Sequence, residues 1–328
     1  MDFLEWAAGR PFTTATAREH GVTRGQLRTW LADGVVRRML TGVYVDATAP
    51  DTIELRVAAV SCVMAPHAVL CDRTAAWLHG VDVFELAEHD VLPAIDVVSK
   101  AGGNASTRSD VFGGERDLLP SEIATVHGVR VTTPIRTACD LACLKGRWRA
   151  IAVLDAFRRA HGITMLDLTL MLPRYRRRRG CRQLRELIPL STDEADSPPE
   201  SWIRLIIHDA GLPVPAAQVW VRLPDGRRFK IENAYAALRI GVEYDGEENH
   251  TSDDDVEHDD DRRGHLVDVE DWIILVITKR DLGPREREAW LAELEEAIAR
   301  RCPERPAKRV YARGPDDPSY RWRRRRRR

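Results

Sequence analysis

The last third of the chain restricts the fold most, because the spacing of its apolar residues is first that of a helix and then that of three strands. Residues 200–209 place apolar side chains on one helical face, and three later segments alternate apolar and polar residues as strands do. The predicted helices and strands, in chain order, are 200–209, 218–223, 228–234, 238–245, 260–269, 272–278 and 285–301. The order helix, three strands, helix, strand predicts an αβββαβ core of the α/β class.

The end of the third strand carries two acidic residues on one face. Glu243 and Asp245 lie two positions apart, and so do Lys230 and Glu232 on the preceding strand. Carboxylates from neighbouring strand ends offer the hard oxygen ligands that Mg²⁺ or Mn²⁺ takes in proteins. Such an ion polarises a phosphodiester and activates water. We therefore predict Glu232, Glu243 and Asp245 as metal ligands, with Lys230 offsetting charge on the phosphate.

The run 240–246 is followed by His250, Arg263 and Trp272. Together they resemble the very-short-patch-repair-like branch of the PD-(D/E)xK nuclease superfamily, which includes the bacterial domain of unknown function 559. The resemblance implies a restriction-endonuclease-like core that hydrolyses DNA with Mg²⁺. It also implies catalytic roles for Glu200, on the first helix, and for His250.

Three positions depart from that family's pattern. Glu232 stands where the family has Asp. The expected His falls on Asn249, with His250 one residue later, and Asp271 replaces a Gly. These departures favour a degenerate nuclease fold that grips DNA without cutting it.

Plainer structural interpretations stay open for the same residues. Glu243 and Asp245 fit a solvated strand face, and Glu200 fits a helix-start carboxylate near the positive end of the helix dipole. His250 is then an ordinary loop residue, and the acidic run 253–261 is interpreted as a solvated loop.

The first 50 residues predict a helix, a second helix and a hairpin. Thr23 and Gln26 form a capping box at the start of the second helix, in which each side chain binds the other residue's backbone N–H. Two short strands follow around a Thr-Gly turn. This layout is that of a winged helix, whose second helix enters the major groove while its hairpin touches phosphates. The predicted DNA contacts are the arginines on these elements, Arg24, Arg28, Arg37 and Arg38.

The same segment carries a set of glycine, aromatic and apolar positions: Gly21-Val22-Thr23, Trp30-Leu31, Gly34 and Gly42-Val43-Tyr44. This pattern resembles the N-terminal domain of AbiEi-type antitoxins, and residues 72–80 and 133–141 resemble segments of the same proteins. The resemblance implies promoter binding and a role in phage defence or toxin–antitoxin control. The partner is then DNA, with a cognate toxin or a second copy of the chain. A winged helix used for protein contact is the alternative.

The middle region, residues 51–190, mixes predicted helices and strands and indicates no chemistry. Strands are predicted at 95–99 and 129–132, with helices before and after them. Arg136 and Asp140 lie four residues apart on one of these helices, which predicts an ordinary ion pair.

Charge is segregated along the chain although the net charge is only −1. Arginines gather within 174–179 and 321–328 and acidic residues within 253–261, which favours a nucleic-acid partner. No apolar run reaches the roughly 18 residues of a membrane span, and the acidic start is unlike a secretory signal, so we expect no membrane partner and a cytoplasmic location. The predicted segments are a winged helix at 1–50, a mixed α+β domain at 51–190, a linker at 191–199, a nuclease-like domain at 200–301 and a basic tail at 302–328.

Together these features predict a DNA-binding protein with a Mg²⁺-dependent endonuclease or nickase domain. The alternative is a non-enzymatic, antitoxin-like transcriptional regulator with a degenerate nuclease fold. A third interpretation is an adaptor in which both modules bind protein, and it predicts no steep dependence of DNA affinity on salt.

Overall fold

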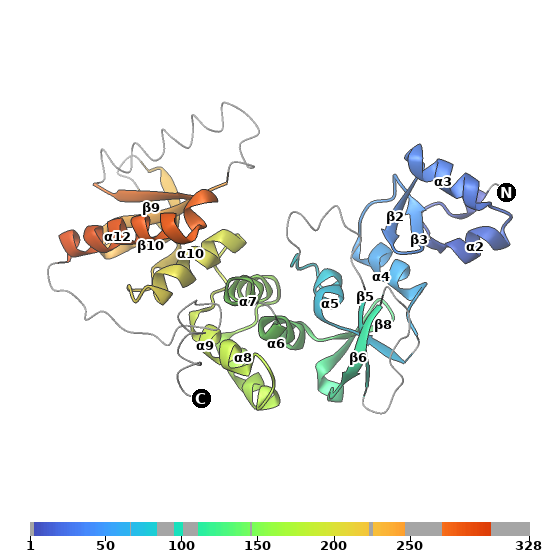
Figure 1. Cartoon of the computed structure of the whole chain (residues 1–328), viewed down its shortest axis with the longest axis horizontal. Helices are drawn as coiled ribbons and strands as arrows, with labels where there is room; N and C mark the ends of the chain where they lie inside the picture. The colour runs from blue at the N-terminus through green and yellow to red at the C-terminus, as the bar shows by residue number, and fades with distance from the viewer. Residues whose placement is uncertain are drawn as a thin grey trace. The chain divides into compact units, whose positions relative to one another are not determined.

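The chain forms two compact units, Met1–Leu141 and Ala142–Arg328, which divide within helix α6 (Pro134–Leu144) (Figure 1). A computed structural model describes residues 3–65, 67–83, 95–100, 111–144, 146–222, 226–246 and 271–302. This division is coarser than the five segments predicted from the sequence. No helix of the described part is long and apolar enough to cross a bilayer, and all six cysteines are free thiols.

The N-terminal elements follow the predicted helix, helix and hairpin order. They are α1 (Phe3–Trp6), β1 (Phe12–Thr13), α2 (Thr14–Glu19), α3 (Arg24–Ala32), β2 (Val36–Leu40) and β3 (Val43–Asp46). The Thr23 side chain accepts the Gln26 N–H at 3.2 Å, and Gln26 Oε1 accepts the Thr23 N–H at 2.9 Å, which confirms the predicted capping box. After α3 the chain turns at Gly34, whose φ of 69° is left-handed and suits glycine.

Residues from both faces of the β2–β3 hairpin join hydrophobic cores. Val36 and Tyr44 pack against α2 and α3. Leu40, Val43 and Val45 instead join the core formed by α4 (Ile53–Ser61) and the sheet that follows. A register shift between Arg38 and Leu40 lets β2 serve both cores. The N-terminal elements and the central sheet therefore share their packing.

The central sheet has five described strands in the order β6-β5-β4-β8-β7. Parallel pairs (β5–β6 and β4–β8) and antiparallel pairs (β4–β5 and β7–β8) occur together. The middle region is therefore mixed, as predicted, although β4, β6 and β7 were not predicted. The elements are β4 (Ala68–Leu70), α5 (Asp72–Leu78), β5 (Ile95–Lys100), β6 (Val111–Arg116), the 3-10 turn η2 (Pro120–Glu122), β7 (Ile123–Val126) and β8 (Val129–Thr132).

In the second unit, α9 (Cys181–Leu187) and α10 (Pro198–Asp209) pack on α7 (Arg147–His161). The buried carboxylate of Asp155 accepts hydrogen bonds from the Thr192 N–H at 2.8 Å, from Ser201 Oγ at 2.7 Å and from Arg204 Nη2 at 2.6 Å. The segment predicted as a linker, 191–199, is thus bonded to α7. The other elements here are α8 (Met165–Met171), η3 (Leu172–Tyr175) and η4 (Ile188–Leu190).

The C-terminal sheet has the strand order β12-β11-β10-β9. β10 runs antiparallel to both β9 and β11, and β12 runs parallel to β11. The predicted order of helix, three strands, strand and helix is present in the described residues, while the helix predicted at 260–269 lies outside them. The elements are β9 (Ala216–Arg222), β10 (Arg228–Tyr235), η5 (Ala236–Leu238), β11 (Ile240–Asp245), β12 (Ile273–Thr278), η6 (Arg280–Leu282) and α12 (Pro284–Arg301).

Both α10 and α12 cover one face of this sheet (Figure 1). Ile240 and Val242 of β11 point into that core, as the alternation predicts. On the other face, Gly241 leaves no space for a side chain, because an added Cβ would lie 2.7 Å from Ile274 Cδ1. The third strand starts at Ile240, two residues later than predicted, because η5 and the left-handed Arg239 (φ 52°) precede it.

Candidate functional site

Helix α3 presents a polar face with small residues at its centre. Leu27 is buried in the N-terminal core, whereas Arg24, Gly25, Arg28 and Thr29 are exposed. Positions three and four apart lie on one side of a helix. The side of α3 that carries the two predicted arginines is therefore accessible and offers little steric obstruction to a DNA groove.

The two arginines of the β2–β3 hairpin, Arg37 and Arg38, differ in exposure. Arg38 is exposed on β2. Arg37 is half-buried, and its Nη2 donates to the backbone oxygen of Ala49 at 3.1 Å. Arg37 thus fixes the loop after β3, and Arg38 is the hairpin residue whose side chain is directed to solvent.

The predicted metal ligands lie on two neighbouring strands, Glu232 on β10 and Glu243 and Asp245 on β11. The β10–β11 register runs from Tyr235↔Ile240 to Asn233↔Val242. The Glu232 carboxylate, however, accepts the Tyr244 backbone N–H at 2.6 Å. Glu243 is 2% exposed, and Asp245 is half-buried at the end of β11.

Among the described residues, no group of three or more His, Cys, Asp or Glu is placed to hold a metal ion. The Glu232 side chain thus reaches across to the backbone of β11. His250 lies outside the described residues.

The remaining predicted catalytic residues, Glu200 and Lys230, take part in local contacts around the start of α10. Glu200 is 3% exposed, and its Oε2 accepts the Asp196 N–H at 3.0 Å and the Gln218 side-chain amide. Lys230 Nζ lies 2.6 Å from Asp196 Oδ2. The plainer interpretation of Glu200, a carboxylate at the helix start, agrees with these contacts.

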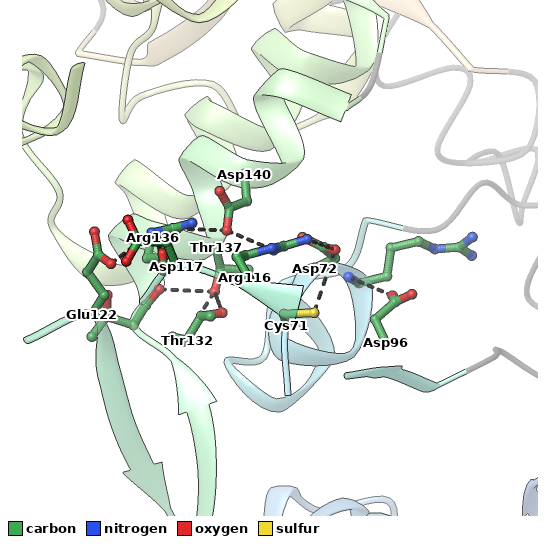
Figure 2. Close-up of polar contacts among 12 residues, drawn as sticks. Cys71, Asp72, Asp96, Arg116, Asp117, Glu122, Thr132, Arg136, Thr137 and Asp140 are labelled. Atoms are coloured by element: carbon green, nitrogen blue, oxygen red, sulfur yellow. Dashed lines mark hydrogen bonds and ion pairs between the residues drawn. The ribbon is translucent and has the colours of Figure 1, made fainter. Parts of the chain in front are cut away.

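The central region holds a buried network of five charged side chains (Figure 2). Arg116 binds both carboxylate oxygens of Asp72 at 2.9 and 2.8 Å, and it reaches Asp140 Oδ2 at 2.9 Å. Arg136, 0% exposed, donates to Asp140 at 2.8 Å and to Glu122 at 2.8 Å. The predicted Arg136–Asp140 ion pair is confirmed as one link of this longer chain, which joins α5, β6, η2 and α6.

Comparison with known proteins assigns this central region. Residues 67–190 match the family of the AbiEi antitoxin C-terminal domain. Two Mycobacterium tuberculosis proteins, Rv2248 of strain H37Rv and MT2308 of strain CDC 1551, are 30% identical to the chain over 262 residues, which is 80% of this chain and 92% of each relative. The chain belongs to their family. The predicted AbiEi-type resemblance is thus supported over the central region, which we call the AbiEi domain.

The charge network of the AbiEi domain stabilises an unusual backbone at the start of α5. Asp72 has a φ of 47°, a left-handed conformation that costs about 1–3 kcal/mol for a residue other than glycine. Its bidentate pair with Arg116 holds it there. Burial lowers the pKa of Arg116, but hydrogen bonds to Asp72 and its charge outweigh that effect and raise the pKa above the ordinary value.

A second carboxyl group of the AbiEi domain lies beside this backbone. Asp96 Oδ2 accepts the Arg73 N–H at 3.0 Å, and the Asp96 N–H donates to Thr74 Oγ1 at 2.8 Å. Burial, and then the negative charge of Asp72, raise the pKa of Asp96 to about 6. Burial also raises the pKa of the Cys71 thiol well above its usual value.

Proposed function

We propose that this protein is an antitoxin-type regulator that binds DNA through α3 and the β2–β3 hairpin. The observation that carries the proposal is the AbiEi antitoxin match over residues 67–190, in a chain whose N-terminal elements have the order and capping of a winged helix. The exposed Arg24 and Arg28 support groove binding, and Arg38 supports contact with a phosphate.

The proposed ligand is duplex DNA of the protein's own promoter, and the proposed location is the cytoplasm. A second copy of the chain or a cognate toxin is the protein partner that an antitoxin domain suggests. Arginine contacts with guanine edges supply specificity, and contacts with phosphates supply a binding constant that falls steeply with salt.

The test is duplex binding by full-length protein, measured by fluorescence anisotropy on its promoter and on a scrambled duplex at several salt concentrations. Arg24→Ala/Arg28→Ala is expected to weaken promoter binding by about 10-fold or more. The matched control, Arg285→Ala/Arg300→Ala, removes two exposed arginines from α12 and is expected to leave binding unchanged. Equal affinity of the wild type for promoter and scrambled duplex, unaffected by the α3 variant, would refute the proposal.

A second candidate function is DNA cleavage by the C-terminal sheet. The observation that favours it is the order of α10, three antiparallel strands and a parallel fourth, with Glu232 of β10 bonded to the backbone of Tyr244, the residue between Glu243 and Asp245. The experiment is nicking of supercoiled plasmid with Mg²⁺ or Mn²⁺ against EDTA, compared with Glu243→Ala/Asp245→Ala. Metal-dependent nicking lost in the double variant supports a nuclease. No nicking by the wild type leaves the regulator as the function of this chain.

A further inference from the structure

The outer hairpin of the C-terminal sheet, β9–β10, carries a cationic and aromatic face. The register pairs Trp220 with Lys230 and Arg222 with Arg228. Residues paired across two antiparallel strands project from the same face, as do residues two apart on one strand. Trp220 is 63% exposed, and both arginines are exposed. These four residues, Trp220, Arg222, Arg228 and Lys230, are called the hairpin face below.

The opposite side of the hairpin explains why these side chains point outward. Val219, Val221 and Phe229 pack with the buried Ile231 and Trp272. Because the core takes every second residue of each strand, the alternate positions face away from it. A large exposed indole at such a position has no part in that core and is accessible to a ligand.

The charges of the hairpin face favour an anion. Arg222 and Arg228 are like charges directly opposite one another, an arrangement that destabilises a strand pair. Among the described residues neither arginine has a carboxylate partner, and an anionic ligand bound between them relieves the repulsion. Lys230 Nζ is held 5.9 Å from the centre of the Trp220 ring, and it is fixed there by Asp196 at 2.6 Å.

We propose that the hairpin face binds single-stranded nucleic acid, with a base stacked on Trp220 and the neighbouring phosphate held by Arg222 and Arg228. One two-residue step along a strand, about 7 Å, separates the indole from the arginine pair. An aromatic platform beside a cationic groove is how proteins hold unpaired strands, since every base has a face that can stack. A base inside a duplex is already stacked on its neighbours, so the hairpin face selects unpaired nucleotides. This site is separate from α3 and does not depend on the duplex binding proposed above.

The experiment uses full-length protein and a fluorescein-labelled oligothymidylate about 12 nucleotides long. Trp220→Ala and Arg222→Ala/Arg228→Ala are each expected to weaken binding by about 10-fold. Arg285→Ala/Arg300→Ala removes the same charge elsewhere and is the matched control. Because these side chains are exposed, the variants are expected to keep the wild-type circular dichroism and melting temperature. Duplex promoter binding, measured in parallel, is expected to stay unchanged in Trp220→Ala, which separates this site from α3.

Photo-crosslinking locates the contact independently of affinity. Oligonucleotides carrying 5-iodouracil, in the deoxyribose and ribose series, are expected to crosslink to the peptide that contains Trp220. The arginine-rich C-terminal tail is the same in all variants and contributes an equal background. Crosslinking in either series supports the proposal, and the stronger series identifies the sugar. Single-strand affinity equal in wild type and Trp220→Ala, or crosslinks confined to other peptides, would overturn it.

Discussion

Arg136→Met deletes the guanidinium that binds two carboxylates in the buried charge network. Glu122 and Asp140, 4% and 6% exposed, lose ion pairs of 2.8 Å each. In the variant Asp140 keeps its ion pair with Arg116 at 2.9 Å, whereas Glu122 keeps the hydrogen bond from the Leu119 N–H at 2.8 Å. The variant therefore leaves Glu122 buried without its cation, and removal of one partner from such a pair costs about 3–5 kcal/mol.

Thermal unfolding of the full-length protein, followed by circular dichroism, measures this cost. With about 3 °C per kcal/mol for a unit of this size, the transition that contains the AbiEi domain is expected to fall by roughly 10–15 °C. Arg136→Lys keeps the charge but cannot bridge both carboxylates with a planar fork, so its melting temperature is expected to lie between those of Arg136→Met and the wild type. Arg285→Met on the exposed face of α12 is the control and is expected to stay within about 0.5 kcal/mol of the wild type. A loss below about 1 kcal/mol for Arg136→Met would show that the network does not stabilise the unit.

Asp96→Asn is expected to gain stability over the wild type as pH rises. The pKa of Asp96 is raised from 3.8 to about 6 in the folded state, so protonation stabilises the fold below about pH 4 and this contribution is lost above pH 6. At neutral pH the free energy of unfolding in urea should therefore be larger for the variant by up to about 3 kcal/mol. A difference between variant and wild type that does not change with pH would contradict this. Thr23→Ala removes the capping oxygen of α3 and is expected to cost about 1 kcal/mol and weaken duplex binding, with Thr23→Asp retaining both. Gly241→Ala places a Cβ 2.7 Å from Ile274 Cδ1 and is expected to cost about 1–3 kcal/mol of stability. The control Gly25→Ala, whose Cβ has its nearest neighbour at 3.8 Å, is expected to be tolerated. Equal melting temperatures for the two variants would contradict the close packing at β11.

Local chemistry was predictable from the sequence. The capping box needs only Thr23 and Gln26, three residues apart, and it fixed the start of α3 correctly. The alternation of Ile240 and Val242 likewise assigned the buried face of β11, because strand periodicity is a local property. The Arg136–Asp140 pair was predictable for the same reason, since both residues lie on one helix.

Contacts between distant segments were not predictable. Arg116 and Asp72 are 44 residues apart, so no local spacing connects them. The Glu232 carboxylate has the right spacing for a metal ligand, but its bond to the Tyr244 N–H depends on strand register and side-chain length. Arg37 has the positive charge expected of a phosphate contact, yet in the fold its guanidinium donates to the backbone oxygen of Ala49. A sequence states which groups are available, whereas the fold decides how they are used.

The shared packing of the β2–β3 hairpin also bears on how such proteins evolve. A chain that ends after residue 50 would expose Met39, Leu40, Val43 and Val45, which are buried against α4 and the central sheet. The N-terminal segment is therefore a poor candidate for domain shuffling, because recombination at its apparent boundary leaves an aggregation-prone apolar surface. With the DNA binding proposed above, a change of specificity is expected to proceed by substitutions on the exposed face of α3, while the β2–β3 hairpin is inherited together with the sheet that supports it.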